Sequence, residues 1–235
     1  MLNGVETMRK SNLKVLHGSN FPAGSEADVY RVQDGVYKKF KMSVKNCVRE
    51  HKKEKLLYLK KLVQLVGDYP EIKYLVENFW RTNLNGYVME EVFGNCLFTG
   101  EVSIEGCLEG LDDLFDVLER FRNEGMYYFD IRQPNIRVVD GKAVLLDVDS
   151  VMLFDDKEPD LLPYALKFYE AKGGKLDEHG QIFMFNNFVK EVFYYGELNW
   201  KLELDEVGRE IMRSVDKVDT VYDHEYLHKH IKRFR

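Results

Sequence analysis

Alternating and helically spaced apolar residues divide the first third of the chain into short strands and one helix. Apolar-rich segments at residues 27–32 and 36–40 flank the turn sequence Gln33-Asp34-Gly35, which predicts an antiparallel hairpin. Apolar residues then recur at helical spacing through residues 44–66, and this spacing predicts one long helix. The other strand candidates of this region are short apolar segments at residues 13–16, 73–79 and 86–92.

The pattern of the remaining chain is mostly helical. Apolar residues between Leu108 and Phe121 follow helical spacing, and Gly125 is a good helix stop. Two strands joined by the Asp140-Gly141 turn come next, and the apolar segment at residues 181–195 predicts a buried helix. A small β-rich part before a larger helical part predicts an α+β protein with two lobes and a cleft near their junction. The expected lobes are residues 1–92 and 93–235, and the expected cleft lies near residues 90–94.

Composition narrows the class of protein without identifying a function. Of the 235 residues, 45% are hydrophobic and 31% are charged, and the formal net charge is −6. These values fit a globular core and argue against a general nucleic-acid binder, although the basic tail HKHIKRFR leaves a local phosphate or RNA contact open. No segment reaches the roughly 18 uninterrupted apolar residues of a membrane span. With three scattered cysteines and no apolar leader, we expect a cytoplasmic protein without a membrane span.

Three polar residues with a suggestive spacing follow the predicted helix that ends near Gly125. Asp130 lies in a polar loop, Asn135 leads into the first strand of the second hairpin, and Asp147 follows its second strand. Because the hairpin turn would fold the two strands together, we expect Asn135 and Asp147 to lie close to each other. An amide oxygen beside a carboxylate suits Mg²⁺, and a third acidic group near them can orient or deprotonate a hydroxyl nucleophile.

This order of residues resembles the catalytic loop and metal-binding strand of the protein-kinase-like superfamily. Tyr128-Phe129-Asp130 stands where that family has His-Arg-Asp, and Asp147-Val148-Asp149 replaces Asp-Phe-Gly. The resemblance implies a bilobal fold, with a small antiparallel β-sheet N-lobe that carries one long helix and a reduced, mostly helical C-lobe. It also implies that Asp130 is the catalytic base, that Asn135 and Asp147 bind Mg²⁺ or Mn²⁺, and that Arg132 contacts the transferred phosphate.

The segment Gly24-Ser25-Glu26-Ala27-Asp28-Val29-Tyr30 resembles a nucleotide-covering loop that enters its second strand, although only Gly24 of the usual three glycines is kept. In the next strand Lys38 shares one face with Val36 and Phe40, so its ammonium points toward the core or the cleft and needs a partner. The resemblance implies that Lys38 contacts the phosphates of ATP and a helix glutamate. We choose Glu54 for that glutamate, with Glu50 as the rival.

The segment at residues 86–92 resembles the last strand and the hinge of the same family. Met89 would then lie behind the adenine, and the backbone of Glu90 and Val92 would hydrogen-bond its edge. The resemblance thus implies an ATP site made by the segments around residues 24–29, 36–38 and 89–92 and by one residue of the helix. These residues are Gly24, Ser25, Ala27, Val29, Val36, Lys38, Glu54, Met89, Glu90 and Val92.

Departures from the family pattern narrow the expected activity. Tyr128-Phe129 replaces His-Arg, no Ala-Pro-Glu follows Asp149, and Gln181 stands where an aspartate often occurs. The sequences GSEADVY and LLDVDSV are similar to those of RIO-type atypical kinases. The resemblance implies an ATP-dependent phosphotransferase, like an atypical Ser/Thr protein kinase, that moves the γ-phosphate of Mg-ATP to an unidentified hydroxyl acceptor. The alternatives are a nucleotide-binding pseudokinase or scaffold, a small-molecule or lipopolysaccharide-sugar kinase of the same fold, and a structural α+β domain.

Overall fold

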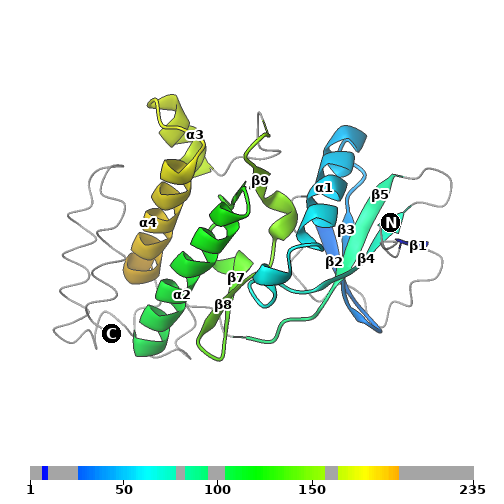
Figure 1. The fold of residues 1–235 in the computed structure, drawn as a ribbon, viewed down its shortest axis with the longest axis horizontal. Helices are drawn as coiled ribbons and strands as arrows, with labels where there is room; N and C mark the ends of the chain where they lie inside the picture. Colours follow the sequence, from blue (N-terminus) through cyan, green and yellow to red (C-terminus); the bar gives the residue numbers. More distant parts are fainter. Residues whose placement is uncertain (1–6, 10–25, 78–82, 95–103, 157–163, 196–235) are drawn as a thin grey trace. The chain divides into compact units, whose positions relative to one another are not determined.

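The protein is a mixed α+β chain that divides into two compact units. The structure, a computed structural model, describes residues 7–9, 26–77, 83–94, 104–156 and 164–195 (Figure 1). One unit is Met1–Val92 and the other is Phe93–Arg235. The strand expected at residues 13–16 lies outside the described residues.

The first unit is built on a five-stranded sheet with the order β1-β4-β5-β3-β2. The short β1 pairs in parallel with β4, and the other pairs are antiparallel. The hairpin predicted at residues 27–40 is confirmed, because β2 and β3 pair directly and Val29 lies opposite Lys38. The strands are β1 (Thr7–Arg9), β2 (Ala27–Val32), β3 (Gly35–Phe40), β4 (Ile72–Glu77) and β5 (Leu84–Met89).

Two glycines allow β3 and β5 to approach closely. A Cβ atom at Gly86 would overlap the carbonyl oxygen of Lys38 and crowd the ring of Tyr37. Gly35 has a φ of +142°, and a Cβ atom there would overlap the carbonyl oxygen of Met89. Neither position therefore accepts a side chain without a shift of the backbone.

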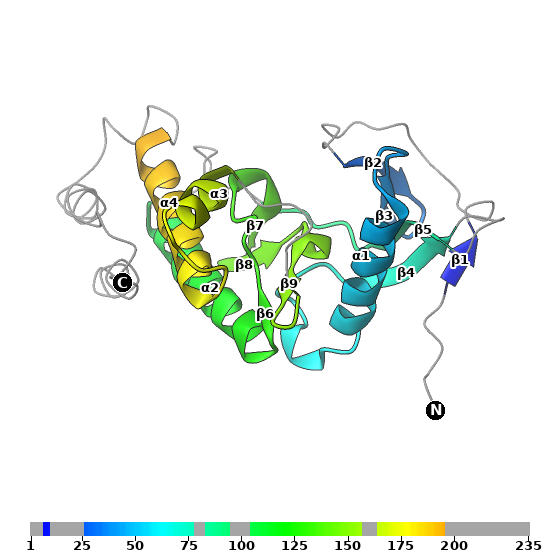
Figure 2. The same cartoon turned by 90° about the horizontal axis from the view of Figure 1, so that it is seen from above.

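The helix α1 (Asn46–Leu59) packs against this sheet and is shorter than the predicted helix at residues 44–66 (Figure 2). It ends at Leu59, whose carbonyl accepts a hydrogen bond of 2.6 Å from the Tyr69 hydroxyl, and the 3-10 turn η2 (Val63–Leu65) follows separately. Much of its buried side is cationic rather than apolar. The buried residues are Arg49, Lys52, Lys55, Leu56 and Leu59.

The second unit consists of helices and two small two-stranded sheets. Its helices are α2 (Ile104–Asn123), α3 (Tyr164–Ala171) and α4 (Glu178–Tyr195). One sheet is the hairpin of β7 (Ile136–Val139) and β8 (Lys142–Leu145), and the other pairs β6 (Met126–Tyr127) with β9 (Met152–Leu153). Two 3-10 turns, η3 (Gln133–Asn135) and η4 (Val148–Ser150), flank the β7–β8 hairpin.

The core of the second unit lies between α2, α4 and the β7–β8 hairpin. The buried helix predicted at residues 181–195 is confirmed as part of α4, and Phe185 and Phe188 are almost fully buried. Asp113 of α2 accepts a hydrogen bond of 2.6 Å from the amide of Ala143, which ties β8 to the helix. The turn between β7 and β8 has positive φ at Asp140 and Gly141, as the Asp-Gly pair predicts. Within the described ranges, no helix is long and apolar enough to cross a membrane.

Candidate functional site

Asp130 and Asn135 are joined by their side chains in the loop between β6 and β7. The Nδ2 of Asn135 donates to Oδ2 of Asp130 at 2.6 Å and to the backbone carbonyl of Asp130 at 3.0 Å. Asn135 is buried, with 6% of its surface exposed. Because its amide nitrogen is directed to Asp130, the side-chain oxygen of Asn135 is the atom that it can offer to a cation.

Asp130 has a second partner in Arg132. The Nε of Arg132 lies 2.9 Å from Oδ1 of Asp130, so the two carboxylate oxygens are held by different residues. The side chain of Arg132 is 56% exposed, whereas that of Asp130 is 20% exposed. An ion pair with so exposed a partner is weak, and Arg132 can exchange Asp130 for another anion at small cost.

The β7–β8 hairpin brings the backbone before Asp147 to Asn135. The amide of Leu146 donates to the carbonyl of Asn135 at 2.8 Å, and Ile136 pairs with Leu145 in the same ladder. Asp147 follows at once and begins the turn η4, where its carbonyl accepts a hydrogen bond of 2.6 Å from the Ser150 hydroxyl. The backbone of Asn135 is thus hydrogen-bonded to the residue before Asp147.

Asn135 and Asp147 carry an amide oxygen and a carboxylate, which are ligand types that a hard cation accepts. Among the described residues, no group of three or more His, Cys, Asp or Glu side chains could hold a metal ion. An amide oxygen and one carboxylate are a small set. Mg²⁺ commonly binds to one or two carboxylates and completes its shell with water and phosphate oxygens.

The loop that carries Asp130 is anchored to α4 through Gln181. The amide of Tyr128 donates to Oε1 of Gln181 at 2.8 Å, and Nε2 of Gln181 donates to the carbonyl of Leu118 in α2 at 3.3 Å. Gln181 is buried. A single amide side chain therefore connects the loop to two helices of the same unit.

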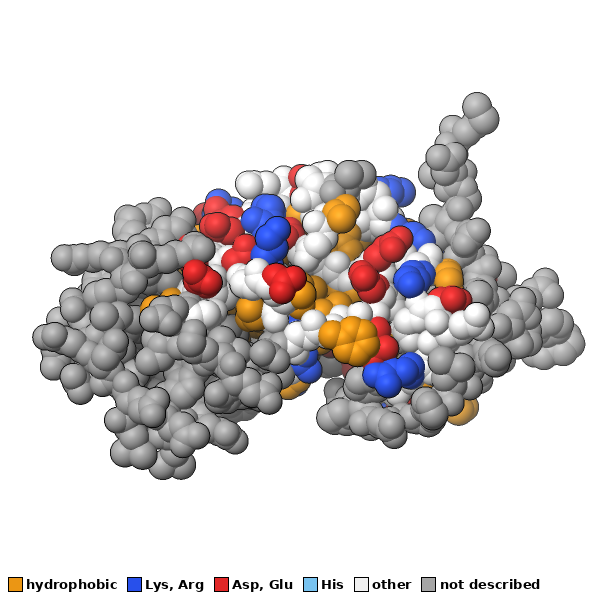
Figure 3. All heavy atoms as spheres, turned by 90° about the horizontal axis from the view of Figure 1, so that it is seen from below, with side chains coloured by type: hydrophobic (Ala, Val, Ile, Leu, Met, Phe, Trp, Pro, Cys, Tyr) orange, Lys and Arg blue, Asp and Glu red, His pale blue; other side chains and the backbone are white. Residues whose placement is uncertain are grey.

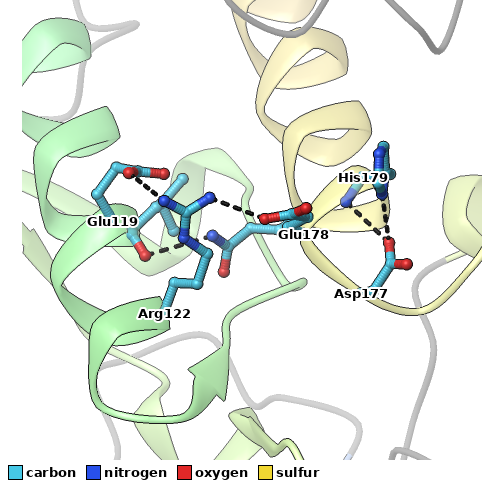
Figure 4. A network of polar contacts seen from close by, with 7 residues as sticks. Glu119, Arg122, Asp177, Glu178 and His179 are labelled. Carbon is cyan, nitrogen blue, oxygen red and sulfur yellow. Dashed lines mark hydrogen bonds and ion pairs between the residues drawn. The ribbon is translucent and has the colours of Figure 1, made fainter.

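The ends of α2 and α4 are joined by ion pairs near this anchor (Figure 4). Arg122 of α2 contacts Glu119 at 2.6 Å and Glu178, the first residue of α4, at 2.9 Å. Asp177 precedes α4 and accepts hydrogen bonds from the amide and the ring Nδ1 of His179. These contacts hold the start of the helix that presents Gln181.

The Tyr128 side chain is fully buried beside several carboxylates. Burial raises the pKa of its phenol well above the ordinary value, and the charges of Asp147 and Asp130 raise it further. The phenol therefore keeps its proton. Within the part of the chain that the structure describes, its hydroxyl has no hydrogen-bond partner.

Residues expected to bind a nucleotide share one face of the first unit's sheet. Strand alternation puts Val36 and Lys38 on the same face of β3, and paired residues of neighbouring strands point to the same side. The register adds Ala27 and Val29 of β2 and Met89 of β5 to that face. Gly24 and Ser25 lie outside the described residues.

The Lys38 side chain reaches over its cross-strand neighbour. Its Nζ lies 5.8 Å from the centre of the Tyr87 ring, and Tyr87 is the residue opposite Lys38 on β5. This distance permits a cation–π contact. The side chain of Lys38 therefore extends from β3 toward β5.

The segment after β5 is held by backbone and side-chain contacts within the first unit. The amide of Glu90 donates to the carbonyl of Glu71 at 2.9 Å, so only the carbonyl of Glu90 is left for the expected adenine contact. Next to it, Glu91 accepts hydrogen bonds from Nε of Arg31 at 2.9 and 3.0 Å. Val92 follows and is partly exposed.

The structure does not bring Glu54 to the sheet, and the choice of Glu54 as the partner of Lys38 is therefore withdrawn. Both Glu54 and the rival Glu50 are exposed, on the side of α1 opposite the buried residues. Lys52 faces the sheet instead and forms an ion pair of 3.3 Å with Glu26, while its Nζ lies 5.8 Å from the centre of the Phe40 ring. Positions 52, 56 and 59 share one helical stripe, and this spacing could have identified Lys52.

On the face drawn in Figure 3, the charged side chains of the described residues form no patch of a single sign. Acidic and basic side chains of the described residues are interspersed there rather than gathered by sign. Such a face offers no extended basic stripe for a nucleic-acid backbone.

Comparison of the sequence with protein-family models and with characterised proteins found no match.

Proposed function

We propose that the chain is an ATP-dependent phosphotransferase with a protein-kinase-like fold that transfers the γ-phosphate of Mg-ATP to a hydroxyl acceptor. One observation carries this proposal. Asn135 donates to Asp130 and pairs through its backbone with Leu146, the neighbour of Asp147. A potential base is thereby hydrogen-bonded to one potential cation ligand, and the residue next to the second potential ligand is hydrogen-bonded to the first.

In the proposed reaction, the acceptor oxygen attacks the γ-phosphorus and the bond from that phosphorus to the bridging oxygen of ADP breaks. The acceptor proton passes to the carboxylate of Asp130, and the products are the phosphorylated acceptor and ADP. A bound Mg²⁺ would neutralise phosphate charge, with Asn135 and Asp147 as its protein ligands. Arg132, now paired with Asp130, would move to the transferred phosphate and free an oxygen of Asp130 to take the proton.

The proposal assigns nucleotide binding to the first unit. The apolar side chains of Ala27, Val29 and Val36 would flank the base, and Lys38 would contact the phosphates. Met89 would lie behind the adenine, and the Glu90 carbonyl and Val92 amide would bind its edge. The common face of β2, β3 and β5 supports this assignment, because all five of the side chains point to it.

Substitution of Asp130 tests the proposed activity. With purified protein, Mg²⁺ and radiolabelled ATP, Asp130→Asn should lower the rate of phosphate transfer or ATP turnover by at least about 100-fold. Asp155→Asn, at an exposed carboxylate of the same unit, is the matched control and should leave the rate unchanged. Equal rates in Asp130→Asn and the wild type would refute the assignment of Asp130 as the base.

A non-catalytic nucleotide-binding protein is the second candidate. It is favoured by the contacts of Asp130, whose two oxygens hold a hydrogen bond from Asn135 and an ion pair with Arg132. The two candidates differ in a direct measurement. Binding of Mg-ATP by the wild type without ADP formation would favour the second.

A further inference from the structure

Among the residues that the structure describes, the buried hydroxyl of Tyr128 finds no acceptor. Tyr128 is fully buried, and its Oη has no hydrogen-bond partner within the described residues. A buried hydroxyl in this condition costs free energy, and native structures rarely leave one without a reason. Its acceptor can therefore be a group that binds to the protein.

The pairing of β6 with β9 leads the chain at Tyr128 toward the turn η4. Tyr128 follows β6, where Tyr127 pairs with Met152 of β9, so the same register continues toward Val151 and the turn η4. That turn starts directly after Asp147. The amide of Tyr128 is held by Gln181, which keeps the residue in place.

Several carboxylates lie near enough to the phenol for their charges to act on it. The charges of Asp147, Asp130 and Asp149 all act on the Tyr128 phenol and favour its protonated form. A protonated phenol donates one hydrogen bond. The nearest of these groups in the chain, Asp130, and the metal-ligand candidate Asp147 both belong to the proposed phosphotransfer site.

We propose that Tyr128 is a positioning residue whose hydroxyl donates to the oxygen shell of the cation bound at Asn135 and Asp147, either to a ligand carboxylate or to a cation-bound water. This inference rests on the proposed function. It gives a role to the tyrosine that stands before Phe129-Asp130. Binding of the metal–nucleotide complex would bring this carboxylate or water within hydrogen-bond reach of the hydroxyl, which then orients it.

Tyr128→Phe removes the hydroxyl and preserves the ring. Calorimetry would measure the dissociation constant of a non-hydrolysable ATP analogue in Mg²⁺ and in EDTA, and thermal unfolding would measure the stability of the ligand-free protein. We expect the variant to have an unchanged or higher melting temperature and to bind the Mg²⁺ complex about tenfold more weakly. Binding in EDTA should not change.

Tyr69→Phe is the matched control, because the Tyr69 hydroxyl donates to the Leu59 carbonyl at 2.6 Å. It should lower the melting temperature and leave nucleotide binding unchanged in both buffers. The opposite results for the two variants would distinguish a hydroxyl that donates to the bound complex from one that stabilises the ligand-free protein.

Three other results would each overturn the proposed role of Tyr128. Equal affinity of the wild type and Tyr128→Phe for the Mg²⁺ complex would overturn this inference and leave the proposed function standing. A Tyr128→Phe protein that is less stable or fails to fold would show that the hydroxyl already has a structural acceptor, such as a water, and would also overturn it. No binding by the wild type would remove the proposed function and this inference together.

Discussion

Lys52 of α1 and Glu26, one residue before β2, form an ion pair of 3.3 Å in which the lysine side chain is 2% exposed. The pair joins the helix to the start of the strand that follows the expected nucleotide-covering segment. The kinase-like resemblance leads one to expect the opposite charges, with a lysine on the sheet and a glutamate on the helix. In this unit the helix supplies a cation.

Glu26→Gln should destabilise the protein because it takes a charged partner from a buried lysine. Since Glu26 itself is 27% exposed, we expect a loss of about 1–3 kcal/mol in the free energy of unfolding. Glu54→Gln makes the same chemical change at an exposed position of α1 and should stay within about 0.5 kcal/mol. Urea unfolding measures both variants.

Exchange of the two charges gives a further check of the pair. The double variant with Glu26→Lys and Lys52→Glu should recover part of the stability that Lys52→Glu alone loses. No recovery, or equal losses for Glu26→Gln and Glu54→Gln, would show that the Lys52–Glu26 contact does not stabilise the protein.

Gln181→Met should loosen the loop that carries Asp130. Methionine keeps the length of the side chain but offers no good acceptor to the Tyr128 amide, so a buried N–H is left unpaired. We expect a loss of about 1–3 kcal/mol in the free energy of unfolding. Amide hydrogen exchange at Tyr128 should become faster.

The exposed Gln64 provides the control for that substitution. Gln64→Met makes the same change outside the core and should alter the free energy of unfolding by less than about 0.5 kcal/mol. Unchanged exchange at Tyr128 in Gln181→Met would contradict the role of Gln181 as the anchor of the loop.

Stability should depend on alkaline pH through Tyr69. Burial, together with the charge of Asp68, raises the pKa of Tyr69 from 10.0 to about 12. Because the unfolded chain releases this proton first, the stability that Tyr69 contributes is complete below pH 10 and declines between about pH 10 and 12. The difference in unfolding free energy between the wild type and Tyr69→Phe should therefore shrink over that range.

Urea unfolding of both proteins at pH 8 and pH 11 measures this difference. Other titrating groups are common to the two proteins and largely cancel in it. A difference that stays constant or grows with pH would show that the Tyr69 hydroxyl does not titrate as its burial requires.

The elements that the sequence predicts well are those whose cause is local. The Gln33-Asp34-Gly35 and Asp140-Gly141 turns predict their hairpins. The β7–β8 hairpin also explains why Asn135 lies beside Leu146, the residue before Asp147. The buried part of α4 is equally visible as a continuous apolar segment.

Elements with a distant cause could not be predicted in the same way. The apolar spacing continues beyond Leu59, but the helix ends there, and the Leu59 carbonyl accepts from the Leu62 amide and from the Tyr69 hydroxyl ten residues later. The pairs β1–β4 and β6–β9 join segments far apart in the chain, and β1, β6 and β9 have only two or three residues each. A helix face predicted from apolar residues alone does not include Lys52, because the apolar stem of a lysine can also be buried.

Gly86 has a consequence for how this sequence can vary. The backbone of Lys38 lies where a side chain at position 86 would have to go, so the spacing between the lysine strand and the strand that ends at Met89 requires the smallest residue. Distant relatives should therefore keep a glycine three positions before the residue that corresponds to Met89, the last residue of β5. That short pattern is a search criterion that follows from steric exclusion and needs no alignment.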